Sequence, residues 1–137
     1  MGDIERIVRN ELLKIGIDLG KDKYPRISFD SRGIAVNYAY DQFMFEDSAG
    51  YHYVTLGGRE SEYTNRVYPD MDSMLYDVDQ VITHNIASQY AAAFGKKHPE
   101  ADFRQVMFAR QLELLNAIRP EFAMKRRKEI DEILQGE

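Results

Sequence analysis

The longest pattern in the chain is a stripe of apolar residues at intervals of three and four between Asp72 and Gly95. This spacing places the apolar side chains on one face of an α-helix that is roughly 36 Å long at about 1.5 Å per residue. Asp72 is predicted to cap the N-terminus of this helix, and Gly95 is predicted to end it in the left-handed conformation. A helix with one broad apolar face requires other elements to cover that face.

Before this helix, the pattern predicts another helix and a group of strands. The turn residues Asp30–Gly33 and Gly57–Gly58 join four strands into two hairpins. The apolar run Phe43–Phe45 and the loop Glu46–Gly50 connect the hairpins. Two successive hairpins predict an antiparallel β-meander of about four strands with one buried face. The predicted helix covers Asp3–Ile17, and the predicted strands cover Arg26–Phe29, Ile34–Tyr40, Tyr51–Leu56 and Arg59–Tyr68.

Two further helices follow the long one. Asp102 is expected to cap a helix at Phe103–Ile118, and Pro120 suits the first turn of a helix at Pro120–Leu134. The bases Lys125–Lys128 are interpreted as the outside of this last helix, where neighbouring acids offset them. The 137 residues are enough to bury a core and predict a single domain, residues 1–137. The predicted fold class is α+β, with an N-terminal helix, the meander, and three α-helices packed on one sheet face.

Composition restricts the chemistry and the cellular location expected for the protein. The chain has no cysteine, which excludes disulfides, thiolate metal sites and cysteine nucleophiles. No run approaches the roughly 20 apolar residues of a membrane span, and the first residues carry acids where a signal peptide needs bases. We therefore expect a soluble cytoplasmic protein that has no membrane partner.

Acidic residues are concentrated in the middle of the chain. The net charge is −5, which disfavours nucleic acid as a partner because that binding depends on phosphate neutralisation. Residues 41–79 carry nine acids against Arg59 and Arg66, while the segments on either side are slightly basic. This distribution allows two interpretations. The acids form either a solvated surface that keeps the protein soluble or a patch that steers a basic partner.

Several short motifs resemble reactive sites. The pairs in Asp70-Met71-Asp72 and Asp77-Val78-Asp79 have the spacing of carboxylate metal motifs, but acids are also favoured at the start of a helix. Gly57-Gly58-Arg59-Glu60 lacks the strand, helix and Lys-Ser/Thr ending of a phosphate-binding loop. The histidines show no convergence with other ligands in the sequence; they are His52, His84 and His98. We therefore expect no catalytic residue, no metal and no cofactor.

A resemblance to a known family appears in the C-terminal half. From Asp102 to Leu115 the chain reads DFRQVMFARQLELL. This run resembles the R…F..QLELL segment of the Imm63-type immunity proteins, which are small intracellular antidotes in bacterial polymorphic toxin and contact-dependent inhibition systems. The similarity covers about residues 50–134 and continues at Tyr51–Val54, Gly58–Glu60, Asp72–Tyr76, Arg119–Phe122, Arg126, Glu129-Ile130 and Ile133-Leu134.

The resemblance implies a non-enzymatic immunity protein, or antitoxin, that binds and neutralises one cognate toxin domain. Many such toxins are nucleases with basic active clefts, and an acidic surface on the immunity protein would suit such a cleft. The predicted partner-binding residues lie in the loops and along the hairpin edge, and they are Asp41, Glu46, Asp47, Arg59, Glu60 and Glu62.

Two other classes of function stay open at this level. The first is a peptide or small-ligand binding module that uses the tyrosine-rich face of the sheet. The second is a hydrolase or transferase that uses Asp70, Asp72, Asp77 or His84. The sequence leaves the identity of the toxin and the oligomeric state undetermined.

Overall fold

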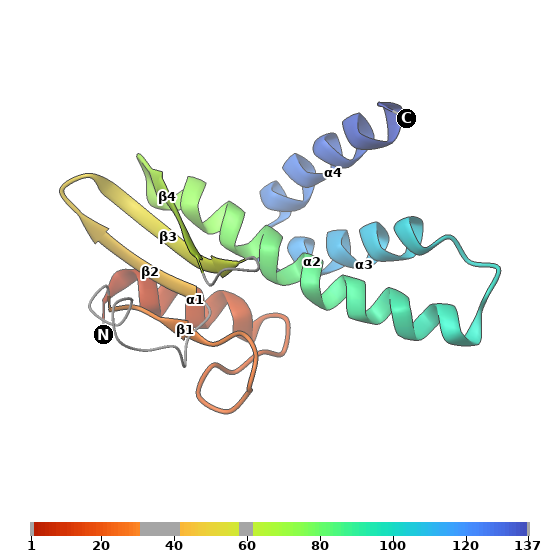
Figure 1. Cartoon of the computed structure of the whole chain (residues 1–137), viewed down its shortest axis with the longest axis horizontal. Helices are drawn as coiled ribbons and strands as arrows, with labels where there is room; N and C mark the ends of the chain where they lie inside the picture. The colour runs from red at the N-terminus through yellow and green to blue at the C-terminus, as the bar shows by residue number, and fades with distance from the viewer. Residues whose placement is uncertain (1, 31–41, 58–61, 137) are drawn as a thin grey trace. The chain divides into compact units, whose positions relative to one another are not determined.

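A computed structural model describes residues 2–30, 42–57 and 62–136 of the chain. The chain forms two compact units, Met1–Val78 and Asp79–Glu137. Helix α2 (Met71–Lys97) begins in the first unit and continues in the second (Figure 1). That residues 1–137 form a single domain stays a prediction.

The first unit contains a helix and a four-stranded sheet whose strands lie in the order β1-β2-β3-β4 (Figure 1). β1 pairs with β2 in parallel, whereas β2 with β3 and β3 with β4 pair antiparallel. The sheet is therefore mixed, and the prediction of a purely antiparallel meander was wrong at β1. The elements are α1 (Asp3–Leu13), β1 (Ile27–Ser28), β2 (Gln42–Asp47), β3 (Gly50–Gly57) and β4 (Glu62–Tyr68).

Strand β2 occupies the segment where the sequence predicts an apolar run and a loop. Phe43 and Met44 are both fully buried, so the strand has no alternation of apolar and polar residues. A two-residue turn, Ser48-Ala49, joins β2 to β3 in place of the longer predicted loop. The predicted turn after β1 and the predicted strand Ile34–Tyr40 fall largely or wholly on residues 31–41, which lie outside the described residues.

The ends of α1 and α2 differ from their predicted positions for local reasons. α1 stops at Leu13 because the N–H of Ile17 donates to the Leu12 carbonyl at 2.9 Å and Gly16 has φ of 82°. α2 begins at Met71, and its cap is Asp70, whose Oδ1 accepts the Ser73 N–H at 2.7 Å. The predicted cap at Asp72 was therefore wrong by two residues.

The prediction also placed the C-terminal end of α2 too early in the sequence. Gly95 lies inside the helix, which continues to Lys97. The N–H of His98 still donates to the Phe94 carbonyl at 2.9 Å. The next residue is Pro99, which has no N–H and disfavours helical conformation in the residue before it. Proline therefore sets the end of this helix.

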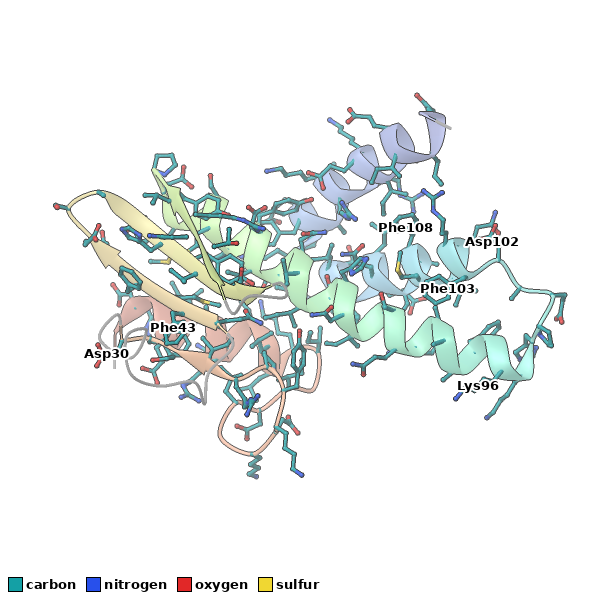
Figure 2. The ribbon with its side chains drawn as sticks, in the orientation of Figure 1. Asp30, Phe43, Lys96, Asp102, Phe103 and Phe108 are labelled. Carbon is teal, nitrogen blue, oxygen red and sulfur yellow. The ribbon has the colours of Figure 1, made fainter. Side chains whose placement is uncertain are left out.

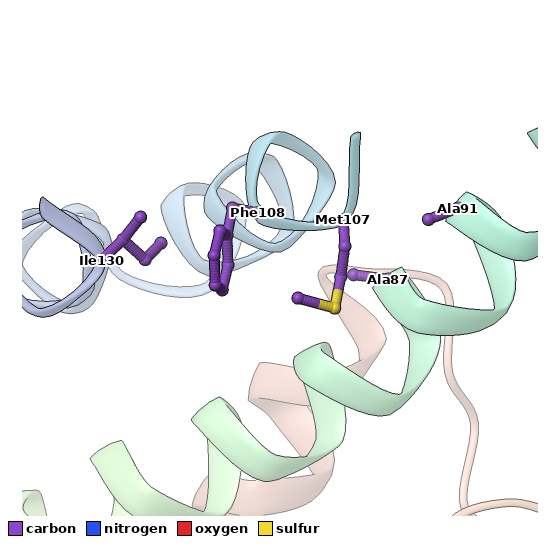
Figure 3. Close-up of a cluster of buried hydrophobic side chains, with 5 residues drawn as sticks. All are labelled: Ala87, Ala91, Met107, Phe108 and Ile130. Atoms are coloured by element: carbon purple, nitrogen blue, oxygen red, sulfur yellow. The ribbon is translucent and has the colours of Figure 1, made fainter. Parts of the chain in front are cut away.

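The second unit is helical, and its boundaries follow the sequence closely. α3 covers Phe103–Ile118, as predicted, and Asp102 caps it by accepting the N–H groups of Arg104 and Gln105 at 2.9 and 3.2 Å (Figure 2). α4 covers Pro120–Gln135, one residue longer than predicted. A buried cluster joins the helices of this unit and consists of Ala87, Ala91, Met107, Phe108 and Ile130 (Figure 3).

The α+β class is confirmed, and within the described residues so is the order of a helix, four strands and three helices. No helix within the described ranges is both long and apolar enough to cross a membrane.

Candidate functional site

The structure describes only part of the predicted contact surface. Asp41, Arg59 and Glu60 lie outside the described residues. Glu62 is the first residue of β4, and its side chain is not described. Glu46 and Asp47 end β2, and both are exposed.

Asp47 organises the turn between β2 and β3. Its Oδ1 accepts the Ala49 N–H at 2.9 Å and lies 2.7 Å from Nε2 of His52. The hydrogen bond to His52, followed by that to Ala49, holds the pKa of Asp47 below its usual value. This carboxylate therefore has a structural role within the hairpin, which the sequence did not indicate.

His52 links three strands of the sheet. Its ring stacks on Phe45 of β2 at 4.5 Å between centroids, and its Nδ1 lies 3.0 Å from Oδ1 of Asn65 on β4. Only 7% of His52 is exposed, and this burial lowers its pKa. The hydrogen bonds to Asn65 and Asp47 outweigh burial, so the net pKa is raised. Because both ring nitrogens face oxygen acceptors, the imidazolium form satisfies both contacts.

Glu46 lines a hollow that we term the acid hollow. It has a volume of about 590 Å³ and gathers the N-terminus of α1, the residues after β1, the end of β2 and the start of α2. Asp30, one of its lining residues, is labelled in Figure 2. Among its described lining residues there is no lysine or arginine. The acid hollow is lined by Gly2, Asp3, Ile4, Glu5, Phe29, Asp30, Met44, Phe45, Glu46, Tyr51 and Met71.

The four carboxylates of the acid hollow differ in their surroundings. Asp3 pairs with Arg6 at 3.4 Å and Glu5 with Arg9 at 2.9 Å, both within α1. Glu46 lies opposite Tyr51 in the strand register. Burial, followed by the charge and hydrogen bonding of Glu46, raises the pKa of the Tyr51 hydroxyl. The hollow thus combines negative charge with aromatic and methionine side chains, which suits an approaching cation.

Of these four acids, only Glu46 belongs to the contact surface predicted from the sequence. Asp3, Glu5 and Asp30 belong to the first 40 residues, where acids and bases nearly balance along the chain. These acids come together in space only because the fold brings α1 and the residues after β1 to the end of β2. No pattern in the linear sequence indicates this convergence.

A second polar group is buried in the helical unit. Gln111 has no exposed surface, and its Nε2 donates to the Gln80 carbonyl at 3.0 Å and to Thr83 Oγ1 at 3.3 Å. Its Oε1 accepts a hydrogen bond from Nε of Arg126 at 3.1 Å. Arg126 also lies over the ring of Phe108 and is only 8% exposed. The interpretation of Arg126 as an outward-facing base was therefore wrong.

These buried polar side chains explain part of the motif around the QLELL run. Gln111 is the glutamine of the QLELL run, and Arg126 belongs to the segment that follows it. Together they connect α2, α3 and α4 through side chains that solvent hardly reaches. Polar residues of the motif thus stabilise the helical unit.

Two residues of the open enzymatic alternative, Asp70 and Asp77, have structural partners. Asp77 accepts the hydroxyl of Tyr68, and burial followed by this hydrogen bond raises the pKa of Tyr68 to about 12. Asp70 caps α2. Burial, followed by the charge of Arg126, lowers the pKa of His84. Within the part of the chain that the structure describes, no three histidine or acidic side chains are grouped to hold a metal ion.

The tyrosine-rich face is only partly described. Tyr53 is fully buried, and its hydroxyl donates to Oε1 of Gln42 at 2.9 Å. Tyr51 lines the acid hollow. Tyr38 and Tyr40 lie outside the described residues, and the side chain of Tyr63 is not described.

Comparison with known proteins places these features in a family. No match is found among curated proteins or among solved structures. The family model described as Immunity protein 63 (Imm63) matches residues 47–132, from the end of β2 to the last turns of α4. This match covers more than half of the chain, and it includes the buried Gln111 and Arg126. The chain belongs to the Immunity protein 63 family.

Proposed function

We propose that this protein binds a cognate toxin domain and neutralises it without catalysing a reaction. Membership of an immunity-protein family supports this function. The protein would act in the cytoplasm of the cell that it protects, where it meets an incoming or newly made toxin. A nuclease toxin fits best, because its phosphate-binding cleft is basic.

The acid hollow is the observation that points to a contact surface. Four carboxylates line the hollow together with aromatic and methionine side chains, and Glu46 is exposed. Such a surface attracts a basic partner over a distance and then receives its lysine or arginine side chains. We propose that Glu46 contacts the toxin, together with Asp41, Arg59, Glu60 and Glu62 of the predicted surface. Asp47 supports this surface by holding the turn.

The test uses the C-terminal domain of a toxin encoded beside this protein. Association and dissociation rates are measured for the wild type and for Glu46→Lys at low and high salt. We expect a one-to-one complex that abolishes toxin activity. Glu46→Lys should slow association by about tenfold at low salt and by much less at high salt, where the charges are screened.

Glu100→Lys is the matched control, because Glu100 is exposed in the loop between α2 and α3 and does not line the acid hollow. It should leave the association rate within about twofold of the wild type. An unchanged rate for Glu46→Lys would remove the acid hollow as the contact surface. The absence of any complex would overturn the proposed function itself.

A further inference from the structure

An apolar groove runs along the outside of the α3–α4 hairpin. It consists of two adjoining hollows of about 700 and 220 Å³ that share Ala109, Leu112 and Arg127. Pro120, Ala123 and Met124 line the first hollow, and Phe108, Ile130 and Leu134 line the second. We term the two hollows together the hairpin groove. Its small alanine side chains allow another helix to approach closely.

Exposed apolar residues border this groove. Met124 is 69% exposed and Leu134 is 43% exposed, although both are large apolar side chains. They lie on the same side of α4 as Arg127 and Asp131, because all four line the groove. Large apolar side chains that are exposed beside polar ones are typical of a protein interface.

The order of these four residues along α4 is symmetric. In the sequence, Met124 and Leu134 lie the same number of positions before and after Glu129. The same is true of Arg127 and Asp131. If two α4 helices pack antiparallel, Met124 of one copy therefore meets Leu134 of the other. Arg127 of one copy then meets Asp131 of the other, and a two-fold axis repeats each contact. These four residues therefore complement one another in charge and hydrophobicity across the axis, and the groove is also lined by the charged Glu113 and Lys128.

We propose that the hairpin groove is the interface of a two-fold symmetric homodimer, in which the α4 helices of two copies pack antiparallel. The charge self-complementarity of α4 selects a second copy of this chain over an unrelated partner. The interface is independent of the acid hollow, which lies in the first unit. Dimerisation can therefore fail while the proposed function holds, and the reverse is also true.

The first measurement is the molar mass of the whole chain by sedimentation equilibrium between about 1 and 100 μM. We expect a monomer–dimer equilibrium within this range. Arg127→Asp alone and Asp131→Arg alone should each weaken dimerisation at least tenfold, because each places two like charges opposite each other. The double variant Arg127→Asp with Asp131→Arg restores opposite charges and should dimerise within about threefold of the wild type.

Two further variants separate the interface from folding. Met124→Lys should abolish the dimer and leave the helical circular dichroism unchanged, since this side chain is exposed in the monomer. Glu132→Lys, on an exposed α4 residue that does not line the groove, should have no effect on dimerisation. A wild type that stays monomeric up to the highest concentration overturns the proposal. If the two single variants dimerise more weakly and the double variant does not recover dimerisation, the antiparallel arrangement is overturned.

Discussion

Arg126 on α4 donates a hydrogen bond from Nε to Oε1 of Gln111 on α3, at 3.1 Å. Both side chains are buried, and Glu129 accepts a second hydrogen bond from Nη1 of Arg126 at 3.1 Å. A buried guanidinium is costly unless its donors have partners. The Gln111 amide supplies one such partner, and its own N–H groups reach back to α2.

Replacement of Gln111 by alanine should therefore destabilise the protein. Gln111→Ala removes an acceptor from Arg126 and leaves a cavity between the three helices, so we expect a loss of about 3 kcal/mol. Urea unfolding followed by circular dichroism measures this loss. Gln105→Ala is the matched control, because Gln105 is an exposed glutamine on the same helix, and it should cost less than about 0.5 kcal/mol. Equal losses for the two variants would contradict a structural role for the buried amide.

The His52–Asp47 pair should make stability depend on pH. The raised pKa of His52 means that its contribution is complete below pH 6.5 and is lost as the pH rises through the folded-state value. The lowered pKa of Asp47 means that its contribution is complete above pH 3.8 and is lost as the pH falls through the folded-state value. The pair therefore stabilises the fold most between these two limits.

His52→Gln tests this dependence. The free energy of unfolding of the wild type should fall as the pH rises above 6.5, and this fall should be smaller in the variant. His98→Gln is the matched control, since His98 is an exposed histidine after α2 and its replacement should preserve the wild-type slope. Identical pH profiles for the wild type and His52→Gln would show that the imidazolium does not stabilise the hairpin.

Gly50 should not tolerate a side chain. Its φ is 135°, and a Cβ at this position would lie 2.6 Å from the Tyr68 carbonyl oxygen of β4. Gly50→Ala therefore combines backbone strain with a steric clash, and we expect a loss of about 2 to 4 kcal/mol. Thermal unfolding measures this loss. Gly2→Ala, at a glycine with nothing near the added Cβ, should leave the melting temperature nearly unchanged. A stable Gly50→Ala protein would mean that β4 moves away from the turn.

Asp102 should contribute to stability as a helix cap. Asp102→Ala removes the acceptor for the N–H groups of Arg104 and Gln105 and should cost about 1 kcal/mol. Asp102→Asn retains a side-chain oxygen and should recover most of that loss, as measured by urea unfolding. If the asparagine variant is as unstable as the alanine variant, the charge of Asp102 rather than its hydrogen bonds stabilises α3.

The helices were largely predictable because their signals are local. The Asp102 cap and the apolar spacing after it fixed α3, and Pro120 fixed the start of α4. The parallel pairing of β1 with β2 had no such signal. It depends on contacts between strands that are not joined by a short turn, and the run Phe43–Phe45 lacks the alternation that identifies a strand.

The burial of Arg126 could have been found from the sequence. Phe122, Arg126 and Ile130 follow one another at intervals of four, so they share the buried face of α4. The run of four bases at Lys125–Lys128 obscured this spacing. The acid hollow offered no comparable signal, because Asp3, Glu5 and Asp30 approach Glu46 only through tertiary structure.

The acid hollow is assembled from residues that extend from Gly2 to Met71 in the sequence. Bringing together residues so far apart in the sequence costs more chain entropy than pairing α3 with α4, which are joined only by Arg119. The cellular level of competent protein is then set by the folded fraction. A substitution far from the hollow that lowers stability by about 2 kcal/mol can reduce abundance several-fold, and so weaken protection without altering one contact residue.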